Sequence, residues 1–426
     1  MLTVTQIDGT ILELTKEQED LVYEAVRYIK SGGKLFQYSA PAGCGKSVVL
    51  RAIVQELGYT DDEIAPMAYT GAASMVMRTN SFHNATTCHS WLYYIKRIPA
   101  GTTRSGKVKY IVKYGKKALP PEIKLILIDE ASMIPWKIRK DIERHDIPVV
   151  ACGDLNQLPP IADYPAYLNQ GKIYYLTQIM RQARMSSIVL LANQILRGEP
   201  LRPGNYGEVV VIPANMLSRE QIISSEIIIC GYNDTRENLT NIIRQARGYR
   251  SEIPSYGEQI VCRENNWNIQ VGDLSLVNGM LGTCVSRDNS ISAMVEDEKY
   301  GRKSFFLDFN PKGSQYVFED IEADYNYFVS NQTERDAIKR RERENPRIPR
   351  KNKFEFGYAI TTHMSQGSQY NQGIYMEETF RKDQINLNYT GLTRFRDRCI
   401  YVLPYNILEP IPTKKMVMVI NGQCQI

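Results

Sequence analysis

One short segment limits the fold of this chain more than any other. Residues 40–47 read Ala-Pro-Ala-Gly-Cys-Gly-Lys-Ser, after the largely apolar run 35–38 and before the helical pattern of residues 48–57. The two glycines let the backbone wrap closely, so that N–H groups can point at phosphate oxygens, and the following helix adds the positive end of its dipole. This order predicts a phosphate-binding loop, although Ala40 stands where the general pattern has glycine.

Two carboxylates follow a second buried run. Residues 125–128 are apolar and flanked by charge, which predicts a buried parallel strand with Asp129 and Glu130 at its carboxyl end. Ligands bind at that edge of open α/β sheets. We therefore expect Lys46 to reach the β- and γ-phosphates of a nucleotide, Ser47 and Asp129 to hold Mg²⁺, and Glu130 to act as general base. The alternative is an Asp129 that caps a helix beside an exposed Glu130.

Composition describes an ordinary globular chain. Its 426 residues leave room for about two to four domains, and 43% of them are hydrophobic. The net charge of +5 permits nucleic-acid binding without requiring it. Eight cysteines without a CxxC pair predict buried, reduced thiols, and four histidines without a zinc-binding grouping argue against zinc. We see no secretion signal and no apolar run near 18 residues, so we expect an intracellular protein without a membrane partner.

Strand and helix patterns alternate along the chain, which predicts an α/β fold of the doubly wound kind. A helix with Thr15 as its N-cap is expected over residues 15–30. The first alternating block is predicted at 35–39, 47–57, 64–69, 71–78, 124–128, 134–143 and 147–151. A second block begins near Leu176, with strands at 227–230, 374–376 and 399–403 and helices at 186–196 and 234–247.

Each block is interrupted once. The segment between Trp91 and Pro121, with its tyrosines, basic residues and turn-like pairs, predicts a β-hairpin inserted into the first block. Residues 284–354 interrupt the second block and contain short strands at 304–307 and 316–318. They end in a charge run, 334–353, with nine Lys or Arg in twenty residues. That run has a plain alternative interpretation as a solvated helix followed by a linker.

Further motifs stand in a telling order. They are Leu14-Thr15-Lys16-Glu17-Gln18, Tyr69-Thr70-Gly71, Thr86-Thr87-Cys88-His89, Gly153-Asp154-Leu155-Asn156-Gln157-Leu158-Pro159-Pro160, Met180-Arg181-Gln182, Thr361-Thr362-His363-Met364-Ser365-Gln366-Gly367 and Asn388-Tyr389-Thr390-Gly391-Leu392-Thr393-Arg394. The set resembles superfamily 1B helicases, in the branch that contains RecD and phage Dda-type helicases. The resemblance covers about residues 12–405, and the compact insertions are most similar to a Dda-type enzyme.

The resemblance implies roles around ATP. Gln18 matches the glutamine that reads adenine, and Gln157 matches the γ-phosphate sensor. Arg181 and Arg394 match the two arginines that reach the γ-phosphate, where a planar guanidinium binds oxygens bidentately. Gly367 matches a backbone contact near the nucleotide. The remaining nucleotide contacts are implied for the loop itself, at Ala42, Gly43, Cys44, Gly45, Lys46 and Ser47.

The resemblance also implies a path for single-stranded DNA. The matching positions are Thr70, Thr87, His89, Thr361 and His363, whose side chains suit phosphate contacts that carry no sequence information. Ordinary capping or turn bonding is the alternative for each threonine. The chain departs from the family at Met364, where Lys or Arg is common, so that one phosphate contact is in doubt. Gly391 and Phe395 also replace the usual alanines without touching the chemistry.

The family architecture implies two RecA-like P-loop motor domains with two insertions. Domain 1A is expected at 1–91 and 121–178, and the hairpin domain 1B, which carries a duplex-splitting pin, at 92–120. Domain 2A is expected at 179–283 and 355–407, and an SH3-like β-barrel, domain 2B, at 284–354, just after the tight-turn pair Asn278-Gly279. Residues 408–426 form a tail without a motif.

These residues and the resemblance together predict an ATP-dependent DNA helicase that uses Mg²⁺, moves on single-stranded DNA and unwinds forked or tailed duplexes. The resemblance implies that the movement is 5′ to 3′. A monomer is expected, with a single-strand-binding protein or a replisome component as a further partner. Replication, recombination and repair are the expected settings, in the cytoplasm of an infected host cell if the phage resemblance holds. The alternatives are a translocase or RNA helicase that displaces proteins without strand separation, and a non-catalytic nucleic-acid-binding subunit.

Overall fold

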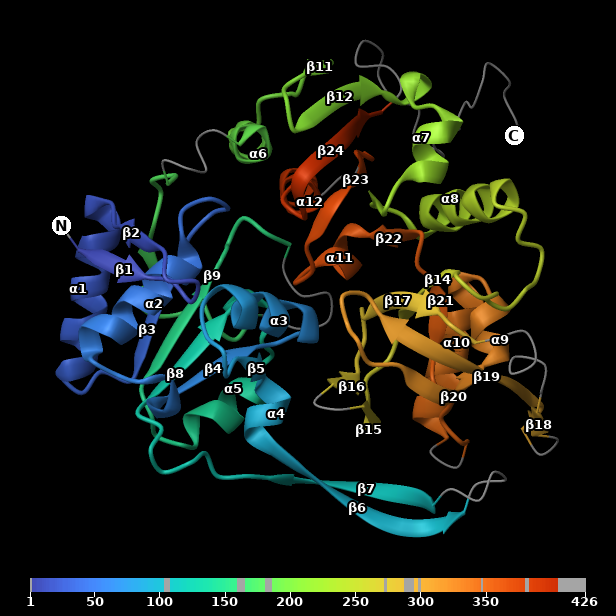
Figure 1. Cartoon of the computed structure of the whole chain (residues 1–426), viewed down its shortest axis with the longest axis horizontal. Coiled ribbons are helices and arrows are strands. Elements are labelled where there is room, and N and C mark those ends of the chain that lie inside the picture. The colour runs from blue at the N-terminus through green and yellow to red at the C-terminus, as the bar shows by residue number, and fades with distance from the viewer. Residues whose placement is uncertain are drawn as a thin grey trace. The chain divides into compact units, whose positions relative to one another are not determined.

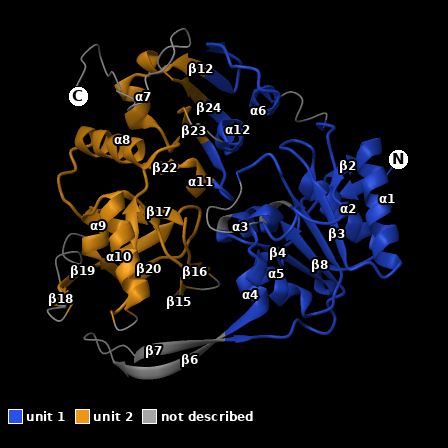
Figure 2. Cartoon of the chain, turned by 180° about the vertical axis from the view of Figure 1, so that it is seen from behind, with its two compact units in different colours: residues 1–210, 366–371, 380–399 blue, residues 211–365, 372–379, 400–426 orange. Residues whose placement is uncertain are grey.

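The computed structural model describes residues 2–102, 108–158, 165–180, 186–271, 274–286, 295–297, 300–345, 348–379 and 383–404. The chain divides into two compact units, coloured separately in Figure 2. Unit 1 comprises residues 1–210, 366–371 and 380–399, and unit 2 comprises residues 211–365, 372–379 and 400–426. The division into domains 1A, 1B, 2A and 2B stays a prediction.

Unit 1 is built on a six-stranded sheet in the order β10-β3-β9-β8-β4-β5. Its paired strands run parallel, for example β3 with β9 and β4 with β8. The strands are β3 (Leu35–Ser39), β4 (Ile64–Ala68), β5 (Thr86–Thr87), β8 (Leu125–Asp129), β9 (Val149–Gly153) and β10 (Tyr174–Tyr175). The helices are α1 (Lys16–Lys30), α2 (Lys46–Leu57), α3 (Gly71–Asn80), α4 (Cys88–Leu92) and α5 (Trp136–Glu143), with α6 (Ser187–Leu196) and α12 (Gln384–Leu392) further along the chain.

The sheet of unit 1 is covered on both faces because alternate side chains of each strand point to opposite sides. On β8, Leu125 and Leu127 join the apolar cluster that contains α1 and α2, whereas Ile126 and Ile128 join the cluster that contains α5 (Figure 1). This arrangement confirms the predicted α/β alternation. The predicted N-cap is confirmed too, since Thr15 and Gln18 form a capping box at the start of α1.

Two antiparallel pairs, one of short and one of long strands, complete unit 1. β1 (Thr3–Thr5) pairs with β2 (Ile11–Glu13), and β6 (Tyr93–Thr102) pairs with β7 (Val108–Lys116) in the register Tyr93↔Lys116. The second pair is the hairpin predicted between Trp91 and Pro121.

A second six-stranded sheet has the order β11-β12-β24-β23-β13-β22. Its strands are β11 (Gly204–Asn205), β12 (Val209–Pro213), β13 (Ile228–Cys230), β22 (Ala359–Thr361), β23 (Tyr370–Met376) and β24 (Phe395–Leu403). Within unit 2, β13 runs parallel to β22 and to β23. Helices α7 (Arg219–Ser224) and α8 (Asn233–Ala246) pack on this part of the sheet through Ile222, Leu239 and Ile243, and the short helix α11 (Thr362–Ser365) follows β22.

Unit 2 also holds an antiparallel sheet in the order β18-β19-β17-β14-β21, with β20 paired to β19. Its strands are β14 (Gln259–Cys262), β17 (Leu281–Cys284), β18 (Val295–Asp297), β19 (Arg302–Pro311), β20 (Phe318–Asp324) and β21 (Phe354–Phe356). The pair β15 (Asn266–Val271) and β16 (Leu274–Leu276) and helices α9 (Tyr325–Val329) and α10 (Gln332–Glu344) accompany it. A phenylalanine-rich core fills it, and the strand predicted at 316–318 starts only at Phe318.

The charge run 334–353 begins as helix α10, which ends at Glu344. The alternative interpretation as a solvated helix and a linker is wrong for several of its residues. Arg335, Glu342, Lys351 and Lys353 are buried, and Lys353 is fully so. A buried charge must be paired, because leaving water costs an ion several kcal/mol. Periodicity could not reveal this, since the partners come from distant segments.

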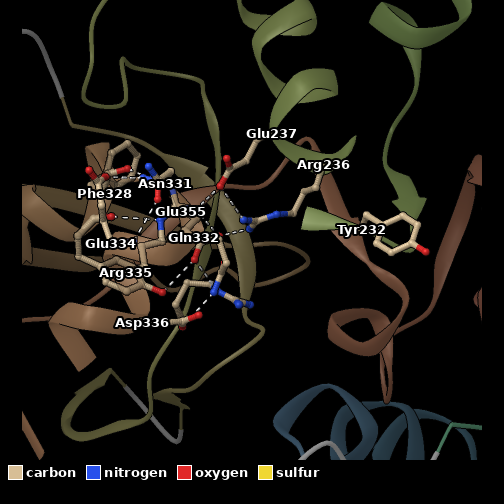
Figure 3. A network of polar contacts seen from close by, with 12 residues as sticks. Tyr232, Arg236, Glu237, Phe328, Asn331, Gln332, Glu334, Arg335, Asp336 and Glu355 are labelled. Carbon is tan, nitrogen blue, oxygen red and sulfur yellow. Dashed lines mark hydrogen bonds and ion pairs between the residues drawn. The ribbon is translucent and has the colours of Figure 1, made fainter. Parts of the chain in front are cut away.

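Glu355 on β21 is the centre of one such ion cluster (Figure 3). Its carboxylate accepts hydrogen bonds from Arg236 on α8, from Arg263 Nε at 2.9 Å and from Tyr327 Oη at 2.9 Å. Arg335 on α10 lies 3.6 Å away. Burial alone would raise the pKa of Glu355, but the guanidinium groups of Arg263, Arg236 and Arg335 hold it below its ordinary value.

Glu355→Gln is expected to destabilise unit 2 by about 3–5 kcal/mol, because it leaves buried guanidinium groups without a carboxylate. The loss is present in full above pH ~4.5, the ordinary pKa of a glutamate, and shrinks as pH falls through the lower folded-state pKa. Urea unfolding at several pH values measures it. The control Glu319→Gln, on the exposed face of β20, should leave the midpoint unchanged. Equal midpoints for both variants would contradict the role of Glu355.

Candidate nucleotide-binding site

The loop between β3 and α2 has the shape that the sequence predicts. Gly43 and Gly45 adopt φ values of +83° and +80°, and Gly45 is the N-cap of α2 in the left-handed region. A Cβ on Gly45 would lie 2.7 Å from Gln18 Nε2 and 2.6 Å from Met180 Sδ, so both the conformation and the close approach require glycine. The loop therefore curls ahead of the N-terminus of a twelve-residue helix, where an anion is favoured.

Gln18 supports this loop directly. Its Nε2 donates to the carbonyl of Cys44 at 2.9 Å, and its Oε1 accepts from the backbone N–H of Thr15 at 3.0 Å. The side chain is fully buried. One N–H and one lone pair of the amide are thus used within the protein, and its role in reading adenine stays a prediction.

Asp129 and Glu130 stand at the carboxyl end of β8, as predicted. Asp129 is buried, and its Oδ1 accepts from Glu130 N at 2.8 Å and from Cys152 Sγ at 3.3 Å. Glu130 adopts φ +51°, which is uncommon for a residue with a side chain. Its Oε2 is buried and has no hydrogen-bond partner among the described residues. Strain and an unsatisfied oxygen at one residue are typical of functional sites, and they argue against an exposed Glu130.

Lys46 and Asp129 influence each other's protonation. Burial alone would lower the pKa of Lys46, but Glu130, Asp154 and Asp129 raise it overall, which keeps the ammonium charged. The pKa of Asp129 is raised from its ordinary value, first by burial and then by Glu130, while Lys46 opposes the shift. Among the described residues, the one hydrogen-bond contact of Lys46 Nζ is a long one to the carbonyl of Ala40, 3.4 Å away, so the ammonium is available to a phosphate.

Asp129 and Ser47, the residues predicted to hold Mg²⁺, offer that ion one carboxylate and one hydroxyl. Among the described residues, no group of three or more His, Cys, Asp or Glu could hold a metal. Mg²⁺ is usually bound by one or two carboxylates together with substrate phosphates and water, and it needs no cage of protein ligands. Asp129 at the strand end and Ser47 at the start of α2 match that pattern.

The loop after β9 is tied to α12. Tyr389 Oη donates to Asp154 Oδ2 at 2.6 Å and accepts from the backbone N–H of Ala42 at 2.7 Å. Two more bonds run from Leu158 N to Thr390 Oγ1, 3.1 Å, and from Asn386 Nδ2 to the carbonyl of Asn156, 2.8 Å. Tyr389 is fully buried and bridges the phosphate loop to a carboxylate. Its pKa is raised well above the ordinary value by burial and then by Asp154.

Arg394 follows α12 and is 5% exposed. Its guanidinium donates from Nε to the carbonyl of Thr390 at 3.1 Å and makes longer contacts, both 3.4 Å, to Ser368 O and Thr393 Oγ1. No described carboxylate forms an ion pair with it. A buried cation without a counterion is costly, and a phosphate oxygen would supply the missing charge.

The other predicted nucleotide residues are placed as follows. Gln157 is buried in the loop after β9, and its backbone N–H bonds the carbonyl of Asp154 at 3.2 Å. Arg181 lies outside the described residues, but its neighbour Met180 donates its backbone N–H to Gly43 O at 2.9 Å. Gly367 has φ +74°, and a Cβ there would lie 2.5 Å from Thr70 Oγ1. Gly367 is thus placed against a predicted DNA-binding residue.

The threonines predicted to line the DNA path also cap helices, which was their alternative role. Thr70 Oγ1 accepts from Ala73 N at the start of α3, and Thr87 Oγ1 accepts from Ser90 N at the start of α4. Thr361, in unit 2, accepts from Met364 N at 3.4 Å. Each cap uses an oxygen lone pair, which leaves the hydroxyl hydrogens of Thr70 and Thr361 able to donate to a phosphate. Thr87 Oγ1 also lies 3.0 Å from Ser90 Oγ, and either hydroxyl can be the donor in that bond.

The two predicted histidines lie on different helices, one in each unit. His89 lies on α4 in unit 1, where burial first and Lys137 second lower its pKa, so the imidazole is neutral at physiological pH. It therefore suits hydrogen bonding better than charge pairing. His363 lies half-buried on α11 in unit 2.

Sequence reasoning missed Tyr389, Asp154 and Gln366 as site residues, although all three lie in the quoted motifs. Gln366 Nε2 donates to the carbonyl of Leu158 at 2.6 Å, and so fixes the same loop that Tyr389 fixes. A tyrosine hydroxyl can donate one hydrogen bond and accept others, which was the only available signal. What it bonds to depends on segments hundreds of residues apart.

Comparison with known proteins identifies several helicases as relatives. The family model for the AAA domain matches residues 13–207. The chain is 31% identical to the ATP-dependent DNA helicase PIF1 of Candida albicans, over 72% of this chain and 38% of that protein. It is 23% identical to the ATP-dependent RecD2 DNA helicase of Deinococcus radiodurans, over 86% of this chain and 47% of that protein. It thus spans less than half the length of these relatives.

Solved structures of similar fold include the Pif1 helicase from Bacteroides in complex with ADP-AlF3 and ssDNA, with 18% identity and a TM-score of 0.47 over 92% of both chains. Another is the Pif1 helicase from Candida albicans, with 17% identity and a TM-score of 0.44 over 92% of this chain and 95% of that one. These relatives do not single out a phage Dda-type enzyme among superfamily 1B helicases. By its motifs and its relatives, the chain is similar to the Pif1-like and RecD-like superfamily 1B helicases.

Proposed function

We propose that this chain is an ATP-dependent DNA helicase that moves 5′ to 3′ on single-stranded DNA and unwinds duplexes. The observation that carries the proposal is Arg394, a buried guanidinium that has no ion pair with any described carboxylate and lies close in sequence to Tyr389, which bonds the phosphate loop. A loop that only binds nucleotide does not need such a residue. An arginine that stabilises the charge of phosphoryl transfer is a device for hydrolysis.

Each predicted nucleotide-binding residue of unit 1 has a task in this proposal. Lys46 binds the β- and γ-phosphates, and the unsatisfied Glu130 Oε2 accepts a proton from the attacking water. Arg394 and Arg181 offset charge on the transferred phosphoryl group, and Gln157 senses it. Mg²⁺ held by Ser47 and Asp129 supplies further positive charge at the phosphates when bound. Gln18 and Gly367 complete the nucleotide contacts.

DNA contact is proposed for Thr70, Thr87 and His89 in unit 1 and for Thr361 and His363 in unit 2. Helix-capping hydroxyls and imidazoles hold a backbone without reading its sequence, which suits a motor that must pass every base. The hairpin β6–β7 is proposed as domain 1B, and the antiparallel sheet β18-β19-β17-β14-β21 as the SH3-like domain 2B, within the domain limits predicted above.

The wider setting is proposed on resemblance alone. A phage Dda-type enzyme would work as a monomer in the cytoplasm of the infected cell, in replication, recombination or repair. A single-strand-binding protein or replisome component would then be its partner. Among the described residues, no helix has the length and apolar character needed to cross a membrane.

One unwinding assay tests the function. Wild type is mixed with ATP, Mg²⁺ and duplexes carrying either a 5′ or a 3′ single-stranded tail, and strand separation is followed by fluorescence. We expect separation of the 5′-tailed duplex only, and none by Lys46→Ala, which removes the phosphate-binding ammonium. ATP hydrolysis stimulated by DNA without separation of either substrate would instead identify a translocase. Separation of the 3′-tailed substrate alone would reverse the proposed direction.

A further inference from the structure

A polar pocket of about 420 Å³ lies in unit 2 beside α10. Four of the side chains that line it are cationic, namely Arg263, Lys339, Arg343 and Arg350. Two carboxylates and two asparagines complete the lining, so every residue in it is polar or charged. Such a pocket has no aromatic platform on which a base could stack and no apolar wall. What it offers to a ligand is positive charge and hydrogen-bond donors.

The two carboxylates of the lining are already engaged. Glu264 and Glu342 both bond the ammonium of Lys353, the second at 2.7 Å, and Lys353 is fully buried. Glu342 also accepts from Arg302 Nη1 at 2.6 Å. These contacts pair Glu264 and Glu342 with buried cations of unit 2. The two carboxylates therefore do not neutralise the cations of the pocket.

The cations of the pocket are poorly compensated. Within the described residues, Lys339, Arg343 and Arg350 form no ion pair, and Arg263 shares the single carboxylate of Glu355 with two other arginines. Burial and then the positive charge of Arg263 lower the pKa of Lys339. A negative ligand would remove that repulsion. Lys339 and Arg343 are four residues apart on α10, so they extend from one face of the helix.

Phosphate groups are the anions that this lining fits best. Arginine presents a planar fork of donors that matches phosphate oxygens, and lysine adds a point charge. Arg343 and Arg350 are exposed, so they can follow a ligand that continues beyond the pocket. Asn265 and Asn278 supply neutral amides of the kind that bond sugar and phosphate oxygens. A chain of phosphodiesters suits these features better than a single enclosed phosphate.

We propose that this pocket is a second nucleic-acid site, formed by unit 2 alone, in which Arg263, Lys339, Arg343 and Arg350 bind the phosphodiester backbone of DNA. The site is distinct from the threonines and histidines assigned to the motor. The choice of DNA as ligand rests on the proposed function. Binding here adds phosphate contacts, and therefore affinity and salt dependence, without adding sequence preference.

The test compares two charge-reversal variants of equal net charge. Arg343→Glu/Arg350→Glu changes two exposed residues of the pocket, and Arg340→Glu/Arg341→Glu changes two exposed residues of the same helix that lie outside the lining. Binding of a forked DNA is followed by fluorescence anisotropy at several salt concentrations. The pocket variant should lose on the order of tenfold in affinity, and the log–log salt slope should fall by about 0.7–0.9 for each lost phosphate contact. Melting temperatures verify that both variants fold.

Three outcomes would overturn the proposal. The pocket variant could bind as wild type does, or the control could weaken binding equally, which would indicate a general field effect. Inorganic pyrophosphate could bind wild type by calorimetry and not the pocket variant, while both bind DNA alike, which would indicate a site for free phosphates.

Arg343→Gln/Arg350→Gln, with roughly half the loss in affinity, would support a graded charge effect. If DNA fails to stimulate ATP hydrolysis by wild type, the proposed function fails, whereas the pocket is judged by the anisotropy alone.

Discussion

Glu130→Gln is expected to lower the rate of ATP hydrolysis by on the order of 10²–10⁴-fold, which is the usual contribution of a positioned general base. The amide has nearly the same size as the carboxylate but cannot take a proton from water. The left-handed backbone of Glu130 should tolerate the change, because it adds no branching at Cβ. Nucleotide binding should therefore survive, since Lys46 and the glycine loop are untouched.

The measurement pairs steady-state ATPase with equilibrium binding of a fluorescent nucleotide. Glu122→Gln is the matched control, because Glu122 is an exposed residue of unit 1 shortly before β8. We expect it to hydrolyse ATP at the wild-type rate. Hydrolysis by Glu130→Gln within a few-fold of wild type would show that another group activates the water.

The local parts of the fold could be predicted because each has a cause close by in sequence. Thr15 and Gln18 form a capping box within one helical turn, and the glycines at 43 and 45 stand where the backbone needs positive φ. The buried strand before Asp129 is recognisable as four consecutive apolar residues. The seven cysteines that the structure describes are buried and form no disulfide with one another, as expected from their apolar surroundings.

The parts that escaped prediction depend on contacts between distant segments. Tyr389 bonds Ala42 across 347 positions, and nothing local distinguishes it from a tyrosine packed in a core. The ion cluster at Glu355 joins α8, β21 and α10, so the sequence alone left a solvated helix and a linker open as an alternative for the charge run 334–353. The strained conformation of Glu130 is another example, because a sequence pattern gives a residue's neighbours and not its φ.

Tyr389 also explains how one loop connects several motifs. Its hydroxyl is held between a backbone N–H of the phosphate loop and Asp154, and α12 ends next to Arg394. A phosphate bound in the loop would therefore lie near Tyr389. This tyrosine ties α12, the helix before Arg394, to the loop. This arrangement gives a direct physical route from nucleotide binding to the placement of Arg394.

Arg394→Ala should lower DNA-stimulated ATP hydrolysis by on the order of 10³-fold or more, the range found for arginines that stabilise charge during phosphoryl transfer. The variant also loses a buried cation that has no carboxylate partner among the described residues, so its folding stability should not fall as it would on breaking an ion pair. ATP affinity should change little, because the ammonium of Lys46 and the loop N–H groups remain.

Two further variants determine whether the guanidinium itself matters. Arg394→Lys keeps the positive charge but loses the planar fork, so it should recover only part of the activity. Arg396→Ala, two residues on and exposed, removes the same charge from the surface and should hydrolyse ATP as wild type does. Single-turnover hydrolysis with saturating DNA, alongside nucleotide affinity, separates catalysis from binding. Full stimulation by DNA in Arg394→Ala would mean that another cation completes the site, whereas a large loss of ATP affinity would make Arg394 a ground-state binding residue.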